Sequence, residues 1–243
     1  MKIDLNCDLG EAAGNDEAIM PYITSANIAC GFHAGDASVM QATVRLAKRY
    51  GVNIGAHPSW PDLQGFGRRE MNISVEETEA LVLYQISALA GIAKAEGLAL
   101  THVKPHGALY NQAAKDRGLA DAIARAVKSF SVDLILVGLA GSGLCEAGVE
   151  VGIKVAGEGF PDRVYNPDGT LMSRSKQGAL IESPEEVVKN ALKLVKDGIL
   201  FGEKKVRVDT LCLHGDNVHA AENAKLLREV LIKNGIEVVG LKR

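Results

Sequence analysis

Polar and titratable side chains follow several apolar, strand-prone runs, at the point where each run ends. They lie in the segments Asn6-Cys7-Asp8, Gly31-Phe32-His33, His57-Pro58, Lys104-Pro105-His106, Glu158-Gly159 and His214-Gly215-Asp216. In a parallel α/β architecture the carboxyl ends of the strands share one rim, where active sites are built. We therefore expect these residues to meet in one mouth. Carboxylates, histidines, a lysine and arginines gathered there suit hydrolysis or phosphoryl-assisted chemistry on a small anionic molecule.

The histidines and acidic residues of these segments also have structural interpretations. A single histidine after a strand is more often a hydrogen-bonded structural residue than a catalyst. Four in such positions nevertheless favour a function for at least two of them: His33, His57, His106 and His214. Asp36 and Asp216 are also typical helix N-caps, and Glu11 is equally suited to start a local turn.

Two arginines flank a strong turn signal in the long segment from Gly157 to Gly178. The turn is Asn166-Pro167-Asp168-Gly169, and the arginines are Arg163 and Arg174. This segment is too long for an ordinary strand-to-helix connection, so we interpret it as a hairpin insertion around residues 158–178. A guanidinium fork recognises planar anions well, which favours anion binding by both arginines over simple surface exposure.

Eight strand-prone runs alternate with amphipathic stretches that carry helix signals. The runs are Ile3–Cys7, Ile23–Cys30, Val52–Ala56, Ala99–Lys104, Asp133–Val137, Gly152–Ala156, Val208–Leu213 and Ile236–Val239. Capping boxes begin the helices expected at Ser74 and Ser183. The alternation predicts an α/β fold, a single (β/α) TIM-like barrel over residues 1–243. A doubly wound open sheet is the alternative, because periodicity does not show closure.

Composition excludes several classes of protein. The chain has 243 residues, 47% of them apolar, with 27 Lys and Arg against 30 Asp and Glu and no basic block, so we expect no binding to nucleic acid. The longest apolar runs fall short of the roughly 20 residues of a membrane helix. Met1 and Lys2 lead directly into polar residues rather than a signal-peptide core, so we expect a cytoplasmic protein. The four cysteines form no Cys-x-x-Cys pair and are expected to be reduced.

Common catalytic motifs are missing. The sequence has neither a phosphate-binding loop nor a complete dinucleotide fingerprint, and neither His-Glu-x-x-His nor Gly-x-Ser-x-Gly occurs. A serine hydrolase and a zincin are therefore disfavoured.

Seven blocks of the sequence resemble the LamB/YcsF family, and the resemblance covers essentially the whole chain. They are residues 4–11 (DLNCDLGE), 27–36 (NIACGFHAGD), 55–59 (GAHPS), 65–69 (GFGRR), 103–111 (VKPHGALYN), 158–163 (EGFPDR) and 213–216 (LHGD). Pro161 stands where the family pattern has alanine, and Asp162 and Arg163 are kept.

The resemblance implies ATP-dependent cleavage of 5-oxo-L-proline, a cyclic amide, to L-glutamate. It implies that the chain works with 5-oxoprolinase subunits B and C, that ATP is a co-substrate, and that a divalent metal, Mg²⁺, accompanies the ATP. It also implies a barrel related to those of polysaccharide deacetylases and glycoside hydrolases, in agreement with the strand pattern.

Roles for single residues follow from the chemistry that lactam opening requires. Phosphate and carboxylate groups need cations, water needs a base and the leaving nitrogen needs an acid. Asp8 and Glu11 are the candidate bases, and His106 or His214 is the candidate acid. The candidate cations and remaining substrate-binding groups are Lys104, Arg69, Arg163, Arg174 and Glu158.

Two other functions stay open from the sequence. One is a stand-alone metal-dependent amidase or deacetylase, with Asp8, His33 and His57 as metal ligands and a metal-bound water as nucleophile. The other is a non-catalytic subunit that binds the lactam and delivers it to catalytic partners.

Overall fold

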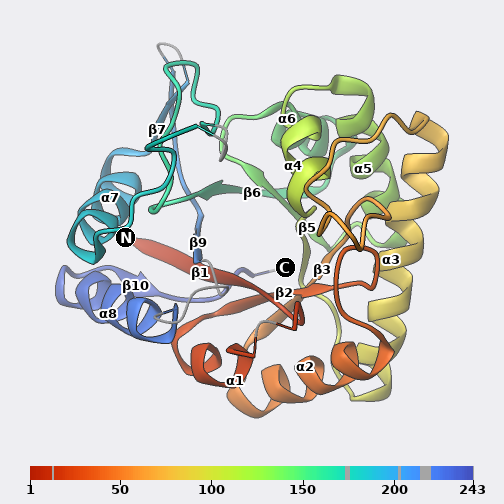
Figure 1. Ribbon diagram of the computed structural model, residues 1–243, viewed down its shortest axis with the longest axis horizontal. Helices are drawn as coiled ribbons and strands as arrows, with labels where there is room; N and C mark the ends of the chain where they lie inside the picture. The colour runs from red at the N-terminus through yellow and green to blue at the C-terminus, as the bar shows by residue number, and fades with distance from the viewer. Residues whose placement is uncertain (13, 173–175, 202–203, 214–219, 243) are drawn as a thin grey trace.

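Parallel strands form a closed ring in the computed structural model of the chain (Figure 1), which describes all residues except 13, 173–175, 202–203, 214–219 and 243. Within the described residues the ring has seven strands: β1 (Lys2–Leu9), β2 (Ser25–Ala29), β3 (Asn53–His57), β4 (His102–Val103), β5 (Ile135–Leu139), β6 (Lys154–Gly159) and β9 (Thr210–Leu213). Strand β9 pairs with both β6 and β1, and this closes the ring. The barrel prediction is confirmed, and an open sheet is excluded.

The eighth strand-prone run lies outside the ring. It forms β10 (Glu237–Val238), which pairs with Lys2 and Ile3 at the start of β1, whereas β9 pairs with residues 4–7 of the same strand. The chain after β10 carries Leu241 onto the apolar side chains at the bottom of the barrel, Ile135, Val137 and Ala156. The eight runs are all strands, but β10 and the segment after it cover one end of the barrel instead of contributing to its wall.

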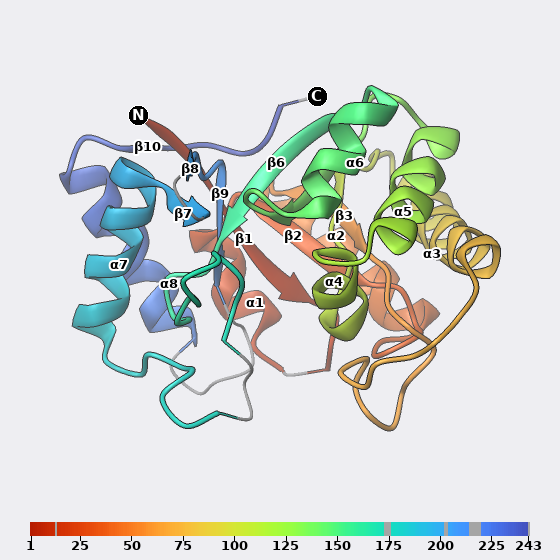
Figure 2. The same cartoon turned by 90° about the horizontal axis from the view of Figure 1, so that it is seen from above.

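Helices connect the strands and surround the ring (Figures 1 and 2). They are α1 (Asp16–Ile19), a 3₁₀ turn η1 (Met20–Tyr22), α2 (Ala37–Tyr50), α3 (Val75–Ala95), α4 (Gly107–Ala113), α5 (Arg117–Phe130), α6 (Gly143–Val151), α7 (Pro184–Asp197) and α8 (Ala220–Lys233). Ser74 and Ser183 cap α3 and α7 as their capping boxes predict, and Asp36 caps α2. No described helix is long and apolar enough to cross a membrane.

Two short segments have structures of their own. A small antiparallel pair, β7 (Ile199–Phe201) and β8 (Lys204–Val206), lies between α7 and β9 and was not among the predicted strands, each member having only three residues. In the segment predicted as a hairpin, antiparallel bridges join Arg163 to Leu180 and Tyr165 to Leu171 on either side of the turn.

The interior of the ring is polar over much of its height. Alternate residues of β1 point inward, and Asp4 accepts hydrogen bonds from the hydroxyls of Thr24, Ser25 and Thr210. Asn6, one step further along β1, donates to Thr210 and to Glu158 of β6. Interiors of such barrels are usually filled by branched apolar side chains. This one holds a hydrogen-bond network instead.

Gly55 of β3 faces this interior beside His102 of β4. A Cβ atom at position 55 would overlap the His102 ring, whose Nε2 lies 2.7 Å from Asn27 Oδ1. The missing side chain therefore makes room for the histidine.

We expect Gly55→Ala to lower the free energy of unfolding by about 1–3 kcal/mol, the usual cost of overpacking a filled interior. Gly91→Ala is the matched control, because a Cβ at this exposed position of α3 meets open space. It should leave stability unchanged or raise it by up to about 1 kcal/mol through helix propensity. Urea unfolding of both variants measures the difference, and equal stabilities would contradict the role given to Gly55.

Candidate active site

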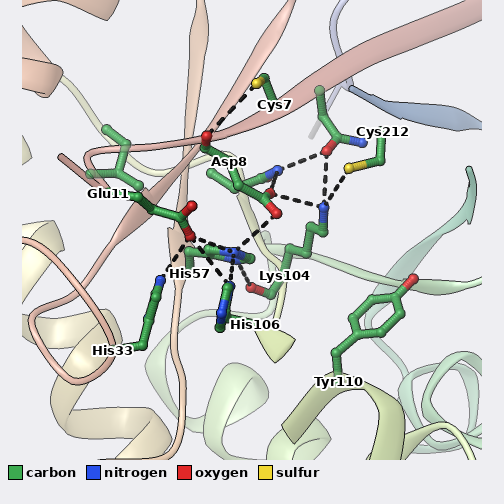
Figure 3. Close-up of polar contacts among 12 residues, drawn as sticks. Cys7, Asp8, Glu11, His33, His57, Lys104, His106, Tyr110 and Cys212 are labelled. Carbon is green, nitrogen blue, oxygen red and sulfur yellow. Dashed lines mark hydrogen bonds and ion pairs between the residues drawn. The ribbon is translucent and has the colours of Figure 1, made fainter. Parts of the chain in front are cut away.

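A cavity of about 780 Å³ opens at the carboxyl ends of the strands. Its wall includes Asp8 at the end of β1, His57 at the end of β3, Lys104 after β4 and Phe160 after β6. The prediction that polar groups at separate strand ends converge is therefore met for these strands (Figure 3). Parallel strands bring these ends together although the residues are far apart in sequence.

Lys104 is the centre of the polar network at the base of the cavity. Its Nζ lies 2.9 Å from Asp8 Oδ1, 2.8 Å from Glu158 Oε1 and 3.2 Å from Asn6 Oδ1. The Lys104 side chain is only 3% exposed, so two carboxylates compensate one buried charge. Phe160 places its ring 5.6 Å from the same Nζ.

Neighbouring side chains hold the partners of Lys104 in place. Asn27 donates to Asn6 Oδ1 and to Asp8 Oδ1 at 2.7 and 2.8 Å. The Tyr110 hydroxyl donates to Glu158 Oε2 at 2.7 Å. Both Glu158 oxygens are thus engaged inside the protein.

The ion pair of Asp8 and Lys104 is stable against neutralisation. Burial would raise the pKa of Asp8, but His57 and Lys104 more than offset it and hold this pKa well below its usual range. Burial would lower the pKa of Lys104, but Asp8 and Glu158 hold it well above its usual range. Both groups are therefore charged at neutral pH.

Three histidines and Glu11 form a second cluster beside this network (Figure 3). His57 Nδ1 lies 2.7 Å from the carbonyl oxygen of Lys104, and His106 Nε2 lies 2.9 Å from that of Phe66. A carbonyl only accepts, so both nitrogens donate. The other nitrogens of the two rings, His57 Nε2 and His106 Nδ1, face each other at 3.0 Å. His33 Nε2 lies 2.9 Å from Glu11 Oε1.

Burial and neighbouring charges separate the pKa values in this cluster. Burial and then Asp8 raise the pKa of Glu11 to about 7. Burial, followed by His57, lowers the pKa of His33 to about 3 and that of His106 to about 2. Burial would also lower the pKa of His57, but Asp8 reverses the effect and raises it. His57, next to Asp8, therefore holds a proton more readily than His33 or His106.

The structure separates the candidate cations. Arg163 lines the cavity and donates from Nη2 to the carbonyl of Met172. Arg69 pairs with Asp62 and lines a separate, smaller hollow, whereas its neighbour Arg68 lines the large cavity. Arg174 and His214, two further predicted site residues, lie outside the described residues.

Some of the residues that build the site were not singled out from the sequence. Asn27 and Tyr110 orient Asp8 and Glu158, and Arg68 lines the cavity. Asn27 and Tyr110 occur within the blocks that carry the family resemblance, which is the only sequence signal for them. Glu158, which the sequence predicts to bind substrate, is fully buried and is not among the residues that line the large cavity.

Comparison with known proteins matches the model of the LamB/YcsF family to residues 3–243. The chain is 53% identical to the 5-oxoprolinase A subunit of Bacillus subtilis over 249 residues, which cover 99% of this chain and 97% of that protein. The crystal structure of a lactam utilization protein from Thermus thermophilus superposes with a TM-score of 0.91 at 48% identity, covering 99% and 100% of the two chains.

A more distant likeness concerns the fold alone. Peptidoglycan deacetylase PdaC from Bacillus subtilis has a TM-score of 0.51 at 15% identity, covering 99% of this chain and 87% of that one. The barrel thus belongs to the structural class of the deacetylase barrels, as the resemblance implied.

We expect Lys104→Met to lower the free energy of unfolding by about 3–5 kcal/mol, because it leaves two buried carboxylates without their cation. The matched control is Lys2→Met, which removes an exposed ion pair to Glu237 and should cost less than about 1 kcal/mol. Denaturant titration compares the two variants. Similar small losses would mean that the buried charge of Lys104 is not a structural requirement.

Proposed function

Because the chain belongs to the LamB/YcsF family, we propose that it is the A subunit of an ATP-dependent 5-oxoprolinase, which opens the cyclic amide of 5-oxo-L-proline to give L-glutamate. The proposed partners are the B and C subunits of that enzyme. The observation that carries the proposal is the position of Asp8, an ionised carboxylate anchored on one side and open to the cavity on the other.

Asp8 has the geometry of a general base. Lys104 and Asn27 both bond to its Oδ1, which fixes the plane of the carboxylate. The side chain remains 20% exposed at the cavity, with Oδ2 3.3 Å from His57 Nε2. In this proposal Asp8 accepts a proton from the attacking water, and Lys104 is a positioning residue that orients Asp8.

The wall of the cavity suits a substrate with a carboxylate. Besides Lys104, the cationic side chains around it are Arg68, Lys115, Arg163 and Lys176. A guanidinium binds a planar carboxylate through paired hydrogen bonds. We assign the carboxylate of 5-oxoproline to Arg163 and Arg68.

Coupling to ATP answers a chemical difficulty of the reaction, since amide resonance protects the lactam carbonyl. In the proposed sequence the amide oxygen attacks the γ-phosphorus of ATP and ADP leaves. Water then adds to the activated carbon, and the C–N bond breaks with the proton going to nitrogen. The resulting acyl phosphate is hydrolysed by a second water to glutamate and phosphate.

The binding site of the nucleotide and the donor of the proton to nitrogen complete the proposed reaction. The sequence has no phosphate-binding loop, so we place ATP binding on the partner subunits or at their interface with this chain. His106, one of two candidate proton donors, has its nitrogens engaged by Phe66 and His57.

We expect the purified chain to release little glutamate from 5-oxoproline and ATP until subunits B and C are added. Glutamate and ADP are measured in parallel for the chain alone, for B with C, and for all three. Turnover by the chain alone without ATP, abolished by a chelator, would instead support a metal-dependent amidase. Saturable binding of 5-oxoproline without any contribution to turnover would support a non-catalytic binding subunit.

In the reconstituted enzyme, Arg163→Lys and Arg68→Lys should each raise KM for 5-oxoproline roughly tenfold, the effect of one lost charge-assisted hydrogen bond. KM for ATP should change little. Arg69→Lys is the matched control, because Arg69 pairs with Asp62 outside the large cavity. A change confined to KM for ATP would assign Arg68 and Arg163 to phosphate instead.

A further inference from the structure

The cluster beside Asp8 has the geometry of a metal centre. Glu11 Oε1 lies 3.3 Å from His106 Nδ1 and 3.7 Å from His57 Nε2, and these two nitrogens are 3.0 Å apart. A tetrahedral zinc ion with ligands at 2.0–2.1 Å would need separations of about 3.3 Å between its ligand atoms. One observed separation equals that value, one is 0.3 Å shorter and one is 0.4 Å longer.

Hydrogen bonding leaves the required lone pairs pointing at one another. His57 Nδ1 and His106 Nε2 both donate to backbone carbonyls, so in the neutral rings His57 Nε2 and His106 Nδ1 carry the lone pairs. Two facing lone pairs at 3.0 Å repel unless a proton or a metal ion lies between them, so a metal ion bound here would take the place of a proton. The backbone bonds also fix each ring in the tautomer and orientation that a metal ligand needs.

His33 belongs to the same cluster but is placed to support it rather than to bind. Its ring stacks on that of His106, with centroids 3.8 Å apart and planes 7° from parallel. A metal ion lies in the plane of each imidazole that binds it, and one ion does not fit both planes. His33 Nε2 instead donates to Glu11 Oε1 at 2.9 Å, the usual contact of a residue that orients a metal ligand.

We propose that Glu11, His57 and His106 bind one divalent transition-metal ion of the zinc class, with His33 orienting Glu11. All three ligands line the large cavity, so the fourth position of the ion would face it. Two imidazoles and one carboxylate favour zinc or cobalt over magnesium and calcium, which prefer oxygen. A bound ion would polarise an oxygen of the substrate or lower the pKa of a water molecule next to Asp8.

This proposal concerns the cavity of the proposed function but rests on geometry alone, and its test needs neither 5-oxoproline nor ATP. The full-length chain, stripped with a chelator, is titrated with Zn²⁺ by calorimetry, with Co²⁺ absorption as a second readout. We expect one equivalent to bind, Mg²⁺ not to compete, and His106→Ala and Glu11→Gln to abolish saturable binding. His33→Asn should weaken binding about 10- to 100-fold and keep one equivalent, as for other residues that support metal ligands.

Asp62→Asn is the matched control, because it removes a buried carboxylate of the neighbouring loop and should leave affinity unchanged. Nitrogen NMR of the unmodified chain avoids any dependence on how the variants fold: Zn²⁺ should shift His57 Nε2 and His106 Nδ1 and leave His102 unaffected. Absence of saturable binding, or unchanged affinity in both ligand variants, would overturn the proposal. A complete loss of binding in a folded His33→Asn variant would overturn the three-ligand arrangement.

Discussion

The buried positive charge of Lys104 is the constraint on which the barrel interior depends. An ammonium group removed from water is stable only when anions and acceptors surround it. Asp8 and Glu158 supply two carboxylates, and each must be satisfied in turn. Their hydrogen-bond partners need partners of their own, and this explains why polar side chains fill the interior of the ring. These side chains are Asn6, Asn27, His102, Tyr110 and Thr210.

Asp8 joins this interior to the cavity. One of its oxygens belongs to the buried network, and the other faces His57 and the histidine cluster. Because each partner is held by several hydrogen bonds in a region of low dielectric constant, the carboxylate has little freedom to turn. The same hydrogen bonds that stabilise the barrel therefore orient the carboxylate of Asp8, which we propose as the base. A substitution deep in the ring should also change the orientation of this carboxylate in the cavity.

The sequence located the site residues at strand ends best and those in loops least well. Asp8, His57 and Lys104 lie where the strand pattern placed them, although Lys104 is buried at the base of the cavity rather than exposed at its mouth. The sequence alone does not show which of the two adjacent arginines, Arg68 or Arg69, lines the cavity. Phe66 and Gly67, which precede this pair, have left-handed backbone conformations. Arg69 forms an ion pair with Asp62, and Arg68 lines the cavity.

The sequence by itself determined the alternation of strands and helices, the caps of α2, α3 and α7, the family and the set of polar residues at strand ends. Local spacing and hydrogen bonding within a few residues encode these features. Only the tertiary structure decided that seven strands close the ring, that β10 lies outside it, and which histidine nitrogens face Glu11. The physical reason is sequence distance: Asn6 meets Glu158 and Thr210 across 152 and 204 residues, and no local pattern specifies such pairs.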